Sequence, residues 1–150
     1  MPANGGLLDD LNLRLLTELQ NDGRLAVAEL GRRVGLSAPA VADRLRRLED
    51  EQVITGYRAE VDPRKLGYTL AVHIRIRPAP RQLADVAELA RQCEEIVECH
   101  RVTGGDCYLM TAHVRDVEHL EALIDQFAAY GQTTTSIRQS SPVPRRPLAP

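Results

Sequence analysis

Three arginines lie within one short stretch of the chain, between Ser37 and Arg47, where Asp43 is the single acidic residue. Arg44 and Arg47 are three positions apart, so on a helix they lie one turn apart on one face, with Arg46 to the side. A guanidinium presents a fork of N–H donors that fits the O6 and N7 acceptors of guanine or the oxygens of a phosphate. The spacing therefore favours a helix that contacts nucleic acid.

The residues before these arginines predict where that helix begins. Ser37 can cap it, Pro39 falls in its first turn, where a missing N–H is harmless, and Leu36 can pack onto Val41. The small residues of the first turn let the backbone approach base edges and phosphates, which a helix N-terminus attracts. The residues expected to contact DNA are Ser37, Ala38, Pro39, Ala40, Asp43, Arg44, Arg46 and Arg47.

The alternative interpretation is a solvated helix face, because runs of charged residues usually indicate no more than exposure to water. Asp43 has two interpretations as well. It could orient an arginine or accept a hydrogen bond from a cytosine amine, or it could be a simple surface carboxylate. The capped start and the sharp turn at residues 34–37 favour the nucleic-acid interpretation.

Two further helices and a short β segment are expected around this helix. Leucines between Leu8 and Leu19 share one helix face, which Asp9 could cap and Gly23 could end. A second helix over residues 25–34 has Ala26 at its cap position, and Glu29 supplies the acidic half of a capping box. Residues 53–61, split by Gly56, predict a hairpin or wing, and the whole region predicts a winged helix-turn-helix.

Beyond residue 62 the hydrophobic period changes from 3.6 to 2. Apolar residues alternate with polar ones over residues 70–77, and a helical face follows over 83–90. Strands are expected at 96–102, 107–114 and 133–139, with a helix over 117–127 before the last of them. The order β-α-β-β-α-β is that of a ferredoxin-like domain, so the fold class is α+β.

Proline-containing breaks divide the chain into four parts. We expect a DNA-binding domain at 7–61, a hinge at 62–67, a ferredoxin-like sensing and oligomerisation domain at 68–141, and a flexible tail at 142–150. The tail carries prolines and two arginines without a periodic apolar face, which is typical of an extended, mobile segment.

Composition limits the partners of the protein. The 150 residues carry a net charge of -2 and have a pI near 6.1, so contact with DNA has to come from a local patch. Three cysteines without a CxxC pair suit reduced thiols better than disulfides. Neither a signal peptide nor a membrane-spanning stretch is recognisable, which predicts a soluble cytoplasmic protein without a membrane partner.

Taken in order, these segments resemble the Lrp/AsnC (feast/famine) family of transcriptional regulators from about Leu8 to Ser141. The resemblance rests on recurring short motifs in matching order and spacing. They are Leu8-Asp9, Leu15-Leu16, Asp22-Gly23-Arg24, Glu29-Leu30, Gly35-Leu36-Ser37, Arg44 with Arg47-Leu48-Glu49, Val53-Ile54, Gly56-Tyr57, Val61-Asp62-Pro63, Leu66-Gly67 and Val102-Thr103-Gly104.

The resemblance implies dimers that assemble into larger rings, commonly octamers, and a small effector, an amino acid or a related metabolite, bound between dimers. We expect no cofactor, metal site or catalytic residue. The effector loop departs from the family pattern, because Gly105-Asp106-Cys107 moves the carboxylate by one position. The effector-binding residues expected are Thr103, Gly104, Gly105, Asp106, Tyr108, Thr133, Thr135 and Ser136. The alternative is that residues 103–106 form only a tight β-turn.

Two other functional classes are possible. Siroheme decarboxylases resemble the same two-domain architecture and use histidines of the second domain, and this chain has His73, His100, His113 and His119. A metal sensor could use Cys99, His100 and Cys107. Adjacent strand residues such as Cys99 and His100 point to opposite faces, however, which disfavours one shared ion.

Overall fold

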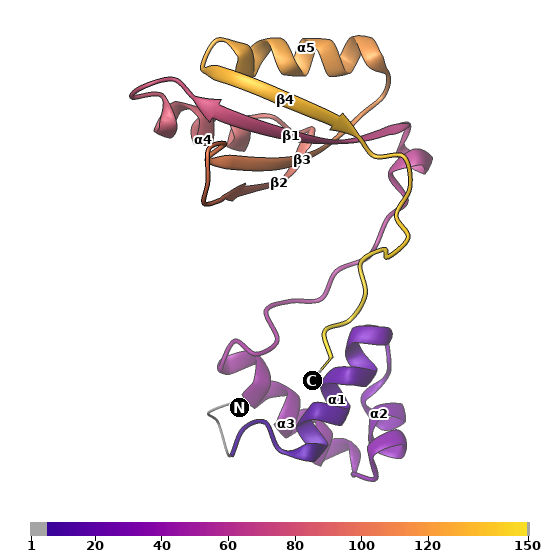
Figure 1. The fold of residues 1–150 in the computed structure, drawn as a ribbon. Helices are drawn as coiled ribbons and strands as arrows, with labels where there is room; N and C mark the ends of the chain where they lie inside the picture. The colour runs from indigo at the N-terminus through magenta and orange to yellow at the C-terminus, as the bar shows by residue number, and fades with distance from the viewer. Residues whose placement is uncertain (1–5, 150) are drawn as a thin grey trace. The chain divides into compact units, whose positions relative to one another are not determined.

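Residues 6–149 are described by a computed structural model, which separates them into two compact units. The first unit contains residues 6–60 together with 143–149, and the second contains residues 61–142. The order of elements along the chain confirms the predicted α+β class. Figure 1 shows the three N-terminal helices and the C-terminal sheet with its helices.

The first unit is built from α1 (Asp10–Asn21), α2 (Val27–Val34) and α3 (Ala38–Asp50). The periodic leucines and valines of the three helices form its core, as the sequence predicts. The leucines and valines of these helices that are at most 4% exposed are Leu15, Leu30, Val34, Val41 and Leu48. The Asp9 carboxylate caps α1 by accepting from the Asn12 amide at 2.8 Å, whereas Ala26 at the start of α2 provides no side-chain cap.

The predicted hairpin over residues 53–61 does not form, and this part of the described chain contains no strand. The amides of Val53 and Ile54 both donate to the Leu48 carbonyl and so close the end of α3. Tyr57 then donates its hydroxyl hydrogen bond to Glu49 at 2.8 Å, and burial is the main cause that raises the pKa of Tyr57 to about 12. The segment therefore forms hydrogen bonds with α3 and does not pair with itself as a hairpin. The 3-10 helix η1 (Pro63–Leu66) follows.

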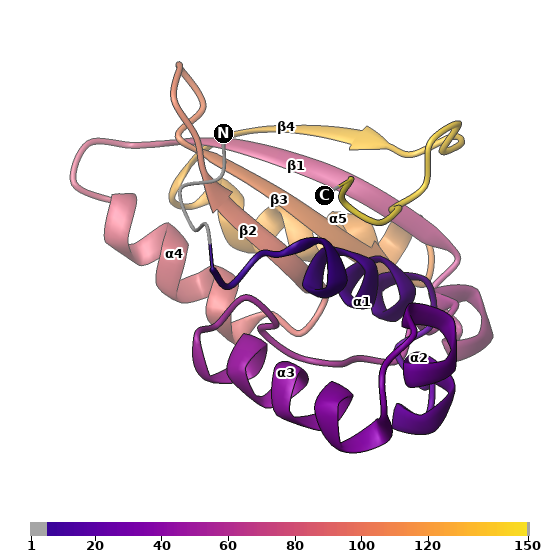
Figure 2. The same ribbon diagram turned by 90° about the horizontal axis from the view of Figure 1, so that it is seen from below.

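The second unit contains β1 (Leu70–Pro78), α4 (Leu83–Gln92), β2 (Ile96–Arg101), β3 (Tyr108–Val114), α5 (Val117–Ala128) and β4 (Gly131–Ile137). The strands form an antiparallel sheet in the order β2-β3-β1-β4, which is the ferredoxin-like arrangement expected from the sequence. Helices α4 and α5 cover one face of the sheet, and the other face carries no element of this unit (Figure 2).

Alternation along the strands separates the two faces of the sheet. Val72, Ile74 and Ile76 of β1 are fully buried on the covered face, where they meet Met110 of β3 and Phe127 of α5. The polar residues between them lie on the open face, as a period of two requires.

The last strand begins two residues earlier than predicted. Gly131 pairs with Pro78, and a Cβ at this glycine would collide with the Arg77 carbonyl oxygen. Gly131, which the sequence places between the helix over 117–127 and the last strand, is therefore itself a residue of that strand. It lies where the backbones of β4 and β1 approach closely.

Candidate functional site

The turn between α2 and α3 fixes how α3 is presented. Gly35 takes up the left-handed conformation at φ 77°, which glycine adopts at low cost. Its amide and that of Leu36 both donate to the Gly31 carbonyl at 2.8 Å. Gly31 lies so close to the Leu36 carbonyl oxygen that a Cβ there would collide with it. Two glycines therefore set the helix-turn-helix angle.

The first turn of α3 is exposed and free of bulky side chains. Ser37 accepts a hydrogen bond from the Ala40 amide at 3.4 Å and thereby caps the helix. Ser37, Ala38 and Pro39 are exposed, and Ala40 is half-buried. The amides of this turn and the helix dipole make it a suitable place for a phosphate.

Arg44 makes contacts within the first unit that its spacing on the helix did not predict. Its Nη1 donates to both carboxylate oxygens of Asp9, at 2.9 and 2.7 Å, and to Oδ1 of Asn12 at 3.0 Å. The hydrogen bond from Arg44 is the largest cause that holds the pKa of Asp9 below its usual value. Arg44 thus joins α3 to the start of α1, and only 28% of its side chain is exposed.

The other two arginines of α3 are exposed and share one carboxylate. Nη2 of Arg47 lies 3.1 Å from Asp43, and Nη2 of Arg46 lies 3.5 Å from it. The two arginine side chains are 71% and 66% exposed. Asp43 therefore orients arginines, as one interpretation of the sequence suggested, and leaves their remaining donors in solvent.

A shallow hollow lies beside these residues, between the start of α1 and α3. Its lining is mainly polar and includes Asp9, Asn12, Asp43, Arg44 and Arg47. The hollow therefore adjoins both the structural ion pair of Arg44 and the exposed guanidinium of Arg47. The sequence did not predict that Asp9 and Asn12 contact Arg44 and line this hollow, because helical periodicity says nothing about contacts between helices.

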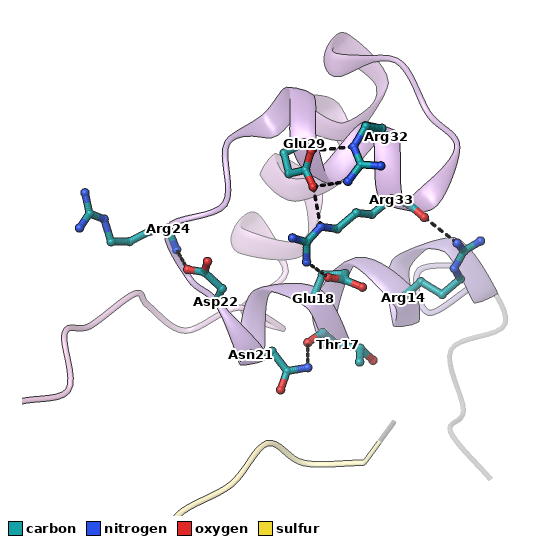
Figure 3. A network of polar contacts seen from close by, with 9 residues as sticks. All are labelled: Arg14, Thr17, Glu18, Asn21, Asp22, Arg24, Glu29, Arg32 and Arg33. Carbon is teal, nitrogen blue, oxygen red and sulfur yellow. Dashed lines mark hydrogen bonds and ion pairs between the residues drawn. The ribbon is translucent and has the colours of Figure 1, made fainter.

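A network of ion pairs joins α2 to α1 on another side of this unit (Figure 3). Glu29 accepts hydrogen bonds from Arg32 and Arg33, and these contacts lower its pKa to about 2. Arg33 reaches across to Glu18 at 2.6 Å, and Arg14 of α1 donates to the Arg33 carbonyl. The carboxylate expected to complete a capping box at Ala26 is bound by arginines instead.

In the second unit, the loop between β2 and β3 is closed by its own backbone. Val102 donates to the Cys107 carbonyl at 2.7 Å, and Gly104 and Cys107 adopt positive φ angles of 104° and 56°. Thr103, Gly104 and Gly105 are exposed, while Asp106 is half-buried. The loop thus has the tight geometry that the turn interpretation required.

Arg77 is a basic residue at this loop that sequence reasoning did not identify. Its Nε donates to the Gly105 carbonyl at 2.8 Å. The guanidinium therefore lies against the loop, on the same side of the molecule as the Asp106 segment. The signal in the sequence was its place at the polar end of the β1 alternation.

The remaining predicted effector residues do not lie on one face. Tyr108 is a core residue, 8% exposed, whose hydroxyl donates to the Leu83 carbonyl at 3.2 Å. Thr133 and Thr135 pair with Ile76 and Ile74 and so belong to the helix-covered face. Ser136 pairs with His73 on the open face. A single site that contains all of them is therefore not formed within one chain, because strand alternation separates them.

The four histidines occupy different surroundings. His73 lies on the open face, 3.4 Å from Thr111 Oγ1, and Arg138 donates to it at 3.4 Å. Burial and the nearby Arg138 lower the pKa of His113. His119 of α5 is bound to Glu95 at 2.8 Å, and this hydrogen bond lowers the pKa of Glu95.

His100 lies 3.9 Å from Glu98 on β2. Cys99 and His100 pair with successive residues of β3 and so point to opposite faces, as predicted. Across residues 6–149, no three histidine, cysteine or acidic side chains are grouped as a metal site would need. No helix in that part of the chain is long and apolar enough to cross a membrane.

Comparisons with known proteins agree with this arrangement. The model of the AsnC-type helix-turn-helix domain matches residues 8–49, and that of the Lrp/AsnC ligand binding domain matches residues 69–148. The uncharacterized HTH-type transcriptional regulator YezC of Bacillus subtilis is 39% identical over 134 residues, which cover 89% of this chain and 95% of YezC.

Two further similarities concern named amino acids. The leucine-responsive regulatory protein of Escherichia coli is 38% identical over 122 residues, which cover 79% of this chain and 74% of that protein. The crystal structure of the transcriptional regulator NMB0573 from Neisseria meningitidis in complex with L-Met has a TM-score of 0.86 at 27% identity and covers 93% of this chain and 94% of that one. These relatives are named as regulators and not as enzymes, so the siroheme-decarboxylase alternative is not supported. The chain is a DNA-binding transcriptional regulator and belongs to the Lrp/AsnC family.

Proposed function

We propose that the protein binds its operators through the exposed side of α3 and that an amino acid bound in the second unit changes this binding. The observation that carries the DNA half is the difference between the arginines of α3. Arg46 and Arg47 extend into solvent, whereas Arg44 is bound to Asp9. Bases and phosphates would therefore meet the first turn of α3 together with Arg47 and Arg46, and Arg44 would hold the helix in place.

One such helix reads too few bases to select a site, so we infer that the working form is at least a dimer. Two copies of α3 would contact half-sites about 34 Å apart, one helical turn of DNA. The family resemblance extends this inference to rings of dimers, commonly octamers. The same function places the protein with the DNA in the cytoplasm.

The sensing half rests on the loop of residues 103–107 and on Arg77. A free amino acid has a carboxylate that a guanidinium and loop amides can bind, and an ammonium group that a carboxylate can bind. Arg77 and Asp106 supply both charges next to the same loop, and Thr103 adds a hydroxyl. The relatives named for leucine and crystallised with L-Met support this ligand class. A ligand alters DNA binding only if it binds one assembly better than another.

Selection of bound duplexes from random DNA tests the DNA half, with the full chain as bait. We expect an inverted repeat with half-sites about 10 base pairs apart, because a two-fold dimer presents two copies of α3. The matched control is Arg47→Ala, which should recover no consensus. If Arg47→Ala selects the same consensus sequence as the wild type, Arg47 does not contribute to sequence recognition and its assignment is wrong.

A further inference from the structure

The three helices of the first unit carry no net positive charge with which to attract DNA. Residues 6–60 contain eight arginines against ten acidic residues, a net charge of -2. Five of these arginines are bound to carboxylates of the same unit: Arg32, Arg33, Arg44, Arg46 and Arg47. Duplex DNA carries one negative charge for about every 1.7 Å of its axis. The three helices alone therefore offer this polyanion little net attraction.

The C-terminal segment joins the first unit, although the sequence predicts a separate flexible tail. Gln20 of α1 binds the backbone of Leu148 through both atoms of its side-chain amide. Nε2 donates to the Leu148 carbonyl at 3.1 Å, and Oε1 accepts from the Leu148 amide at 2.9 Å. Two hydrogen bonds to one residue fix both the position and the direction of the segment. Figure 1 shows the yellow C-terminal segment beside α1.

The docked segment carries two arginines that the fold does not use. Arg145 and Arg146 are exposed, and neither side chain has a hydrogen bond or an ion pair among the described residues. Prolines at 142, 144 and 147 surround them, and each fixes one backbone angle and lowers the entropy lost when the segment is ordered. The segment therefore presents two free guanidinium groups on a stiffened backbone anchored at Leu148.

We propose that residues 143–148 form an arm that binds the phosphate backbone of DNA through Arg145 and Arg146. The arm brings the net charge from -2 for residues 6–60 to 0 for the whole first unit, since it adds two arginines and no acidic residue. Phosphate contacts of this kind position a protein on the duplex and carry no sequence information. The arm would therefore increase the affinity for DNA, while α3 recognises the sequence. This proposal rests on the DNA binding proposed for α3.

A salt titration of DNA binding tests the arm with the full chain and a duplex selected by it. The slope of log K against log salt falls by about 0.9 for each phosphate that the protein no longer neutralises. Arg145→Ala with Arg146→Ala should therefore reduce the slope by up to about 1.8 and weaken binding to selected and scrambled duplexes by the same factor. An unchanged slope would overturn the proposal.

Two further variants separate the arm from simpler explanations. Arg81→Gln with Arg101→Gln removes two exposed arginines of the second unit and should leave the slope unchanged, whereas an equal loss would show that only total charge matters and would overturn the proposal. Gln20→Ala removes the anchor and keeps both arginines, and it should also reduce the slope. If Gln20→Ala lowers the midpoint of unfolding but leaves the salt slope of DNA binding unchanged, the segment only stabilises the fold and the proposal fails. A wild type that binds no duplex would instead refute the DNA binding of α3.

Discussion

Nη1 of Arg44 lies 2.7 Å from Oδ2 of Asp9, and this ion pair connects the middle of α3 to the residue that caps α1. The same nitrogen donates to Oδ1 of Asn12, a polar side chain that is only 4% exposed. One arginine of α3 therefore has a structural role, which distinguishes it from Arg46 and Arg47.

Replacing Arg44 should destabilise the fold more than replacing Arg47. Arg44→Ala leaves the buried Oδ1 of Asn12 without its donor and removes the partner of Asp9, which should cost about 1–2 kcal/mol of unfolding free energy. Arg47→Ala removes an exposed ion pair and should change it by less than about 0.5 kcal/mol. Urea denaturation of both variants measures the difference, and equal losses would disprove the structural role of Arg44.

Gly31→Ala should destabilise the turn between α2 and α3. The added Cβ collides with the Leu36 carbonyl oxygen, a backbone atom that cannot rotate away, so we expect a loss of about 1–3 kcal/mol. Gly23→Ala is the matched control, because the nearest atom to its Cβ would be 3.8 Å away. Thermal unfolding compares the two. A Gly31→Ala protein as stable as the control would mean that this close approach does not fix the turn.

The network around Glu29 should make stability depend on acid. Its pKa is about 2 in the folded chain and 4.5 in the unfolded reference, so the unfolded state binds the proton first as the pH falls. The contribution of Glu29 is complete above pH 4.5 and is lost between pH 4.5 and 2. Glu29→Gln should therefore flatten the stability profile in this window, as chemical denaturation at successive pH values would record. If the unfolding free energies of the wild type and of Glu29→Gln changed in parallel with pH, the low pKa assigned to Glu29 would be contradicted.

The loop at residues 103–107 should bind an amino acid through groups of opposite charge. A thermal-shift screen of the twenty amino acids should find at least one stabiliser, because a ligand bound only to the folded state raises its stability. Its effect should fade in Asp106→Ala and in Arg77→Ala, and it should persist in Thr134→Ala, a control at an exposed position of β4. A screen without any stabiliser would leave the loop as a structural turn.

Much of the fold follows from local patterns. Ser37, Asp9 and the alternation from Leu70 to Arg77 predicted helix starts and a strand that the structure contains, since caps and periodicity depend on near neighbours. The resemblance to a known family supplied the effector loop.

Contacts between distant residues could not be predicted in this way. The ion pair of Arg44 with Asp9 was not foreseen, because 35 positions separate the two residues in the sequence. Thr135 and Ser136 are neighbours on one strand and so had to lie on opposite faces, but which of them lies on the open face depends on the pairing of β4 with β1, which the sequence does not show. The 128 residues that separate Gln20 from Leu148 likewise hid their hydrogen bonds.

The most direct test of the central claim is a footprint of the double variant Arg46→Ala and Arg47→Ala on the duplex that the wild type selects. We predict that protection of both half-sites disappears while the unfolding curve stays that of the wild type, because these side chains extend from α3 into solvent. An unchanged footprint would contradict the claim that α3 reads DNA through this pair.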